Sequence, residues 1–155
     1  MTGAVTIAPA DPTMPAARAL IAALDHYLGG LYGAEDNHLL DPERLRAPDI
    51  RFLLAVRDGV AMGCGALRLD VPGGYAEIKR MYVDPACRGQ GVASAILSAL
   101  AQTARASGLL LLKLETGERQ VEAVALYRRL GFTPCASFAE YPCNGASLFL
   151  EKRLD

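Results

Sequence analysis

The stretch VDPACRGQGVASAIL, residues 83–97, contains the most informative pattern in this sequence. An apolar run typical of a β-strand stops at its Asp-Pro pair, and the small and branched residues after its second glycine predict a helix. The turn between them consists of Arg88, Gly89, Gln90 and Gly91. Glycines let a ligand approach the backbone closely, and unpaired N–H groups at a helix start attract phosphate. The stretch therefore predicts an anion-binding loop between a strand and a helix.

Two common phosphate-binding motifs fit this loop poorly. A P-loop needs Lys followed by Ser or Thr after its last glycine, but Gly91 is followed by Val92 and Ala93. The dinucleotide motif needs a third glycine where Ser94 stands, and it should follow a chain-initial strand rather than a hairpin. A purely structural turn stays open, although it accounts for one glycine and not for an arginine with two glycines.

Outward from the loop, hydrophobic patterning predicts several strands. The candidates are residues 4–9, 49–56, 60–69, 75–83, 109–116, 133–141 and 145–154. Asp58 and Gly59 separate the second and third of these and predict an antiparallel hairpin. The apolar residues of 75–83 do not alternate cleanly, which indicates a bulge or burial on both faces. Residues 109–116 are typical of a strand buried on both faces in a parallel pair.

Helices are predicted in three places. The first has apolar spacing from Ala16 to Leu28 with Gly29 and Gly30 beyond its end, and the others cover residues 92–106 and 118–132. Gly131 suits a left-handed helix cap. Residues 31–48 are expected to form a loop with a short helix. The fold class is therefore α/β, with one domain over residues 1–155 and a mixed, mostly antiparallel sheet flanked by helices.

Composition narrows the classes of function. The 155 residues are 52% apolar and 21% charged, with a net charge of −1 and no basic tract, so nucleic acid is not an expected partner. The apolar run 109–112 is far shorter than a membrane helix, and residues 1–12 lack a basic signal-peptide head, so we expect a cytoplasmic protein without membrane contact. No metal site is expected, because the cysteines lack metal-ligand spacing: Cys64, Cys87, Cys135 and Cys143.

The loop also resembles a family motif. RGQGVA, residues 88–93, is similar to the R/Q-x-x-G-x-G/A motif of the GNAT superfamily of N-acetyltransferases, with Arg88, Gly91 and Ala93 in the defined positions. MYVDPACRGQGVASAIL, residues 81–97, resembles the family's fourth strand, pyrophosphate loop and third helix, and AVALYRRLGF resembles its fourth helix. The resemblance covers roughly residues 75–132. It implies a sheet with splayed central strands and acetyl-CoA as the cofactor.

The resemblance also implies roles for particular residues. Cofactor contacts are expected from Met81, Tyr82, Val83, Arg88, Gly89, Gln90, Gly91, Val92, Ala93, Ser94 and Gln120. Tyr127 matches the tyrosine that protonates the leaving thiolate, and Glu77 is the candidate base for the acceptor amine, with Glu115 as an alternative. Gln120 stands where many relatives carry asparagine, which weakens that assignment.

The expected activity is transfer of an acetyl group from acetyl-CoA to a primary amine of a small molecule or a protein, by direct attack in a ternary complex. Weaker candidates for the acceptor pocket are Tyr32, Glu35, Asp36, Asn37, His38, Asp41 and Tyr141. A non-catalytic acyl-CoA-binding sensor is the main alternative, and an unrelated nucleotide-binding domain is a third. A homodimer through the late strands is a further expectation.

Overall fold

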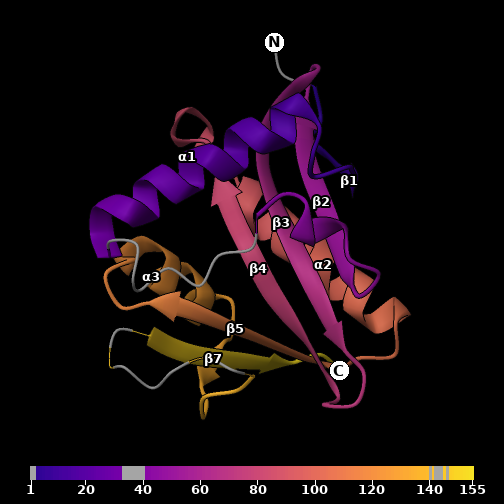
Figure 1. The fold of residues 1–155 in the computed structure, drawn as a ribbon, viewed down its shortest axis with the longest axis vertical. Coiled ribbons are helices and arrows are strands. Elements are labelled where there is room, and N and C mark those ends of the chain that lie inside the picture. The colour runs from indigo at the N-terminus through magenta and orange to yellow at the C-terminus, as the bar shows by residue number, and fades with distance from the viewer. Residues whose placement is uncertain (1–2, 33–40, 140, 142–144, 146) are drawn as a thin grey trace.

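A sheet with the strand order β1-β2-β3-β4-β5-β7-β6 forms the centre of the computed structural model, which describes residues 3–32, 41–139, 141, 145 and 147–155 (Figure 1). The strands are β1 (Thr6–Pro9), β2 (Ile50–Arg57), β3 (Val60–Asp70), β4 (Tyr75–Val83), β5 (Leu111–Gly117), β6 (Thr133–Pro134) and β7 (Ser147–Arg153). The helices are α1 (Pro15–Tyr32), α2 (Val92–Ala106) and α3 (Val121–Arg129), with 3-10 turns η1 (Arg44–Arg46) and η2 (Pro85–Cys87). None of these helices is long and apolar enough to cross a membrane.

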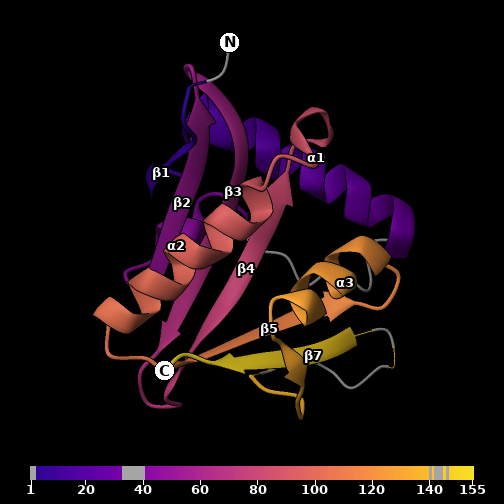
Figure 2. The ribbon, with the colours of Figure 1, turned by 180° about the vertical axis from the view of Figure 1, so that it is seen from behind.

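The helices cover both faces of the sheet. Helix α1 lies across one face, and α2 and α3 lie on the other, as the two opposite views show (Figures 1 and 2). Each face has its own buried core. On the α1 side, Leu20 and Ile21 pack with Phe52 and Leu54. On the other side, the core centres on Ile96 and Leu100 of α2 against the apolar residues of β3, β4 and β5.

The sheet is mostly antiparallel, as predicted. Asp58 and Gly59 have φ values of 51° and 78°, which is the left-handed pair that a tight two-residue hairpin between β2 and β3 requires. Strands β1 to β4 pair antiparallel, and β7 pairs antiparallel with β5 and β6. Within the described residues, only β4 and β5 run parallel. The chain crosses between them through α2. The prediction that β5 is buried on both faces is only partly right, because Leu112 and Leu114 are buried whereas Lys113 and Glu115 on the other face are partly exposed.

Strands β4 and β5 separate after a short paired segment. Their pairing begins at Ala76 with Leu112 and ends at Ile78 with Leu114. Beyond that point β4 continues to Val83 and β5 to Gly117, and the two ribbons diverge (Figures 1 and 2). The splayed central strands that the family resemblance implied are therefore present.

A bulge distorts β4 where the strands part. Ala66 of β3 pairs with Lys79, whereas Cys64 pairs with Tyr82, so β4 contains one extra residue in this interval. Arg80 lies in the bulge and has a φ of 55°, in the left-handed region that a non-glycine residue seldom adopts. The irregular apolar pattern predicted a bulge or burial on both faces, and β4 has both: the bulge lies at Arg80, and residues 75–78 are all buried.

Several predicted boundaries were wrong. Helix α1 continues through Gly29 and Gly30 to Tyr32, because packing of Leu24 and Leu28 outweighs the weak helix propensity of two glycines. The strand predicted over residues 133–141 is limited to β6, since the chain leaves the sheet and places Phe138 in an aromatic cluster. Helix α3 begins at Val121, three residues after the predicted start at residue 118, and it ends before the predicted cap at Gly131.

Candidate active site

The predicted anion-binding loop lies at the start of α2. Gly89 and Gly91 have φ values of 76° and 78°, and an added Cβ would meet nothing within 4 Å at either position. These glycines are therefore required by backbone conformation and not by crowding. No side chain caps the first turn of α2, which leaves its N–H groups available to an anionic ligand.

A pocket of about 230 Å³ adjoins this loop, which we call the loop pocket. Its lining comprises Val83, Cys87, Arg88, Gly89, Gly91, Val92, Ala93, Ser94, Leu126 and Arg129. The structure thus brings most of the predicted cofactor residues to one place. Arg88 approaches Glu122 at 3.6 Å, but both side chains are largely exposed, so this ion pair contributes little and leaves the guanidinium available. Arg129 also lines the loop pocket and was not predicted to do so. Its position in the last turn of α3 could have suggested this role.

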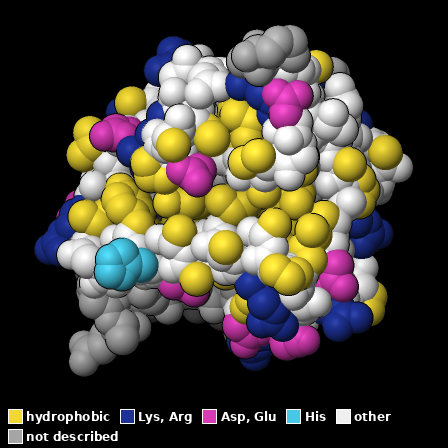
Figure 3. All heavy atoms as spheres, turned by 90° about the horizontal axis from the view of Figure 1, so that it is seen from above, with side chains coloured by type: hydrophobic (Ala, Val, Ile, Leu, Met, Phe, Trp, Pro, Cys, Tyr) yellow, Lys and Arg dark blue, Asp and Glu magenta, His cyan; other side chains and the backbone are white. Residues whose placement is uncertain are grey.

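A second cavity of about 90 Å³ lies where β4 and β5 diverge, and we call it the β4–β5 cleft. It is lined by Leu24, Leu28, Ile78, Lys79, Arg80, Met81, Leu114, Glu115, Thr116, Gln120, Tyr127 and Tyr141. The cleft therefore contains the predicted Met81, Gln120 and Tyr127. At the end of the molecule toward which β4 points, apolar side chains form a band across the surface with charged side chains around it (Figure 3).

Tyr127 reaches the cleft from α3. It is 6% exposed, and its ring meets the Phe132 ring edge to face at a centroid distance of 5.6 Å. Gly131 has a φ of 97°, and the Phe132 N–H donates to the Tyr127 carbonyl at 3.0 Å, so the predicted left-handed cap is confirmed. Burial raises the pKa of the Tyr127 phenol above its usual value, which keeps the hydroxyl protonated at neutral pH.

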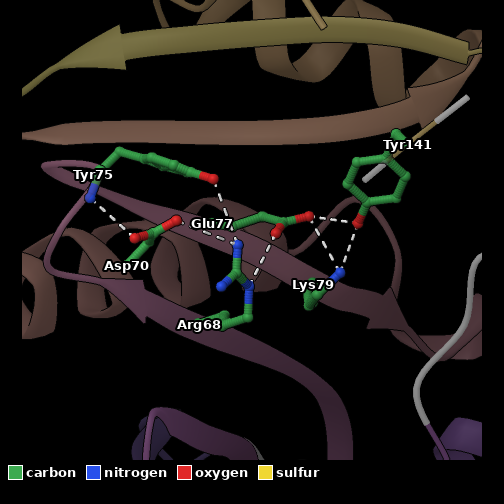
Figure 4. Close-up of polar contacts among 7 residues, drawn as sticks. Arg68, Asp70, Tyr75, Glu77, Lys79 and Tyr141 are labelled. Carbon is green, nitrogen blue, oxygen red and sulfur yellow. Dashed lines mark hydrogen bonds and ion pairs between the residues drawn. The ribbon is translucent and has the colours of Figure 1, made fainter. Parts of the chain in front are cut away.

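Glu77 is buried in an ion-pair network on the α1 side of β4 (Figure 4). Arg68 Nε donates to Glu77 Oε1 at 3.2 Å, and Lys79 Nζ donates to Oε2 at 3.1 Å. The Tyr141 hydroxyl also donates to Glu77, and Lys79 Nζ donates to the Tyr141 oxygen at 2.5 Å. Burial and then the charge of Glu77 raise the pKa of Tyr141. Lys79 and Tyr141 line the cleft whereas Glu77 is absent from its lining.

Glu115 is the carboxylate on the cleft wall. It lies on β5 just beyond the last residue paired with β4, and it accepts a hydrogen bond from Ser147 Oγ at 2.7 Å. In contrast to Glu77, no ion pair to Glu115 is found within the described residues. Its carboxylate is therefore better placed to receive a proton from a molecule in the cleft.

The remaining predicted residues lie elsewhere. Tyr82 packs against the core on the α1 side, and Gln90 accepts a hydrogen bond from Arg57 Nη1 at 2.5 Å. Asp41 is exposed and accepts the Arg44 N–H at 2.9 Å. The other weak acceptor-pocket candidates, Glu35, Asp36, Asn37 and His38, lie outside the described residues, as does the side chain of Tyr32.

Comparison with known proteins agrees with this geometry. The family model "Acetyltransferase (GNAT) family" matches residues 17–132. The IAA acetyltransferase of Azospirillum brasilense is 49% identical over 150 residues, covering 97% of this chain and 98% of that protein. The N-acetyltransferase YedL of Escherichia coli, itself uncharacterized, is 36% identical over 96% of this chain and 94% of its own length.

A solved structure has a similar fold over nearly the whole chain. A Klebsiella pneumoniae protein assigned as an acyl-CoA N-acyltransferase has 38% sequence identity and a TM-score of 0.82, over 97% of this chain and 98% of that one. The likeness thus extends over the sheet, the loop pocket and the β4–β5 cleft together. From the family model and these near full-length relatives, the chain belongs to the acetyltransferase (GNAT) family.

Proposed function

We propose that the chain transfers an acetyl group from acetyl-CoA to a primary amine that binds in the β4–β5 cleft. The observation that carries the proposal is the combination of two adjacent features. The start of α2 presents uncapped N–H groups to the loop pocket. Beyond Ile78, the edge of β4 that faces β5 has no strand partner among the described residues. The first feature suits a diphosphate, and the second suits the amides of an extended pantetheine chain.

Cofactor binding is assigned to the predicted residues with two changes: Arg129 is added, and two of the predicted residues act through their backbone. Arg88, Gly89 and Gly91 to Ser94 surround the diphosphate, aided by Arg129. The backbone of residues 81–83 orients the acyl thioester, which is the reactive group that acetyl-CoA supplies. Gln90 and Tyr82 contribute through their backbone alone, because their side chains contact Arg57 and the α1-side core.

Tyr127 and Glu115 are assigned the proton transfers. As the amine nitrogen bonds to the acyl carbon and the carbon–sulfur bond breaks, the departing thiolate takes the Tyr127 proton. Glu115 receives the proton that the amine loses, since it lines the cleft and Glu77 does not. Glu77 is assigned to hold Lys79 and Tyr141 in place on the cleft wall.

The loop is tested by titrating acetyl-CoA calorimetrically into the wild type and the Gly91→Glu variant. The added carboxylate should clash with the diphosphate and abolish binding. Gly108→Glu is the matched control, because Gly108 has the same φ of 78° and the same open surroundings at the other end of α2. Equal affinity in wild type and Gly91→Glu would remove the loop from the site.

A non-catalytic acyl-CoA sensor is the second candidate. Release of free CoA thiol in the presence of an amine panel separates it from an enzyme, since a sensor binds acetyl-CoA without turnover. A single domain over residues 1–155, a cytoplasmic location and a homodimer stay predictions. Light scattering after size-exclusion chromatography tests the last of these.

A further inference from the structure

Arg80 is a buried cation with unmet hydrogen-bonding capacity at the bulge of β4. Its side chain is 2% exposed. Nη2 donates to the Asp25 carboxylate at 2.7 Å and to the Ile21 carbonyl at 3.2 Å. Its Nε and Nη1 are buried and have no hydrogen-bond partner among the described residues. Arg80 lines the β4–β5 cleft, and it adopts the left-handed backbone conformation that disfavours a side chain.

These features are costly for the protein without a ligand. A buried guanidinium needs a counter-ion and partners for its donors, and each orphaned donor disfavours the folded state. Asp25 compensates only in part, because its side chain is 48% exposed and it contacts Nη2 alone. Such strained and unsatisfied groups persist at sites that a ligand completes. An anion in the cleft would complete this one.

The anion is not supplied by the cofactor in the proposed function. The diphosphate is assigned to the loop pocket, whose lining contains no residue of the cleft. The thioester that reaches the cleft is uncharged. Lys79, which neighbours Arg80 on the same wall, is already paired with Glu77 at 3.1 Å, so the unmet donors of this wall are those of Arg80. Glu115 of the cleft wall accepts a hydrogen bond from Ser147 and forms no ion pair with Arg80 among the described residues, so the acceptor is the remaining ligand that could bring an anion to Arg80.

We propose that Arg80 binds a carboxylate of the acceptor, so that the acceptor class is amino acids and related amines that carry a carboxylate. This inference rests on the proposed acetyl transfer, which makes the cleft the acceptor site. The cleft then offers Glu115 to the amine and Arg80 to the carboxylate. Leu24 and Leu28 of α1 favour an apolar side chain on the acceptor.

The test uses acetylated products, so that binding is measured without turnover. N-acetyl-L-leucine and N-acetyl-L-phenylalanine are titrated into the wild type with CoA present. Their neutral counterparts, N-(3-methylbutyl)acetamide and N-(2-phenylethyl)acetamide, differ only by the missing carboxylate. We expect at least one acid to bind about tenfold or more tightly than its counterpart, as a buried charge-assisted hydrogen bond provides. Equal binding within both pairs, or no binding of either acid, overturns the proposal.

Arg80→Gln should abolish this preference while acetyl-CoA binding remains. Arg51→Gln is the control, since Arg51 is exposed and does not line the cleft. Within the described part of the chain it donates to the Pro48 and Ile50 carbonyls alone. Without ligand, Arg80→Gln should melt no lower than the wild type, because it removes a buried charge that the half-exposed Asp25 compensates only in part. A lower melting temperature with an unchanged preference for the acids would make Arg80 a structural residue and overturn the proposal.

Titration of acetyl-CoA separates this inference from the proposed function. A wild type that binds the N-acetyl acids but not acetyl-CoA contradicts the proposed function and supports an anion site at Arg80. A wild type that binds acetyl-CoA but shows no carboxylate preference contradicts the inference alone.

Discussion

At the scale of single residues, Tyr127 is buried and also lines the cleft wall. Burial raises its pKa, so the hydroxyl is protonated throughout the neutral range, and its place on the cleft wall is what suits it to pass a proton to a departing thiolate. Tyr127→Phe should lower kcat on the order of 100-fold while the calorimetric affinity for acetyl-CoA stays unchanged. An unaltered kcat at saturating concentrations of both substrates would reject the acid role.

Replacing the two carboxylates near the cleft by amides should have different effects, one on catalysis and the other on stability. Glu115→Gln should lower kcat and flatten the dependence of kcat/KM on pH, because the cleft then lacks its proton acceptor. Glu77→Gln should mainly destabilise the fold, by about 3 kcal/mol, because it leaves Arg68 and Lys79 without their shared buried counter-ion. Steady-state kinetics and urea unfolding of both variants measure this. The reverse pattern would return the base role to Glu77.

The sequence predicted Glu77 and Glu115 as candidate bases, but it could not predict which of the two lines the cleft. Glu77 was the candidate base because it lies on the strand before the loop, and that position is correct. Its buried network includes an ion pair with Arg68, nine residues away, and a hydrogen bond from Tyr141, 64 residues away. Such contacts arise when distant segments meet on one face of the sheet, and local patterning does not encode them.

At the scale of elements, β3 lies close to the end of β4 and to α2 at Gly63. A Cβ at Gly63 would lie 2.7 Å from the Tyr82 carbonyl oxygen, which is backbone and cannot rotate away. Gly63→Ala should therefore destabilise the fold by about 1–3 kcal/mol and weaken acetyl-CoA binding, since it displaces the open edge of β4. Urea unfolding and calorimetry measure the two effects.

Gly29→Ala is the matched control for that substitution. Gly29 lies inside α1, and an added Cβ would meet nothing within 4 Å. Alanine should stabilise the protein by about 0.5–1 kcal/mol, because it restricts the unfolded chain and favours the helix. Loss of stability in both variants would show that glycine content, and not the close approach at Gly63, sets the outcome.

Element order was predictable, whereas several element ends were not. The hairpin at Asp58 and Gly59 and the cap at Gly131 followed from backbone requirements that few residue types meet. The end of α1 did not, because contacts of Leu24 and Leu28 with the rest of the fold outweigh two glycines. The strand expected over residues 133–141 failed for the same reason, as Phe138 packs against Tyr75, Tyr141 and Phe149.

At the scale of the whole molecule, buried thiol and phenol groups make the free energy of unfolding depend on pH in the alkaline range. Burial raises the pKa of the Cys64 thiol from 9.0 to about 12, and it also raises the pKa values of Tyr127 and Tyr141. The unfolded chain loses these protons first, so the folded state holds more protons between about pH 9 and 12. Stability from these groups is therefore complete below pH 9 and declines as the pH rises.

Urea unfolding at pH 7, 9 and 10 should show this decline, with the thiol accounting for about 1 kcal/mol by pH 10. Cys64→Ala should reduce the slope of stability against pH. Cys87→Ala, at a thiol that is not buried, should retain the full slope. A wild-type stability that stays constant to pH 10 would contradict the burial of these groups.

By itself the sequence determined the order of strands and helices, the glycine loop at the start of α2 and the family to which the chain belongs, because these depend on residue types at short separations. Only the tertiary structure decided how far β4 and β5 separate, which carboxylate faces the cleft and that Arg80 is buried with unmet donors. Those properties arise from packing between segments far apart in the chain, where burial and the nearest charges set the chemistry of each side chain.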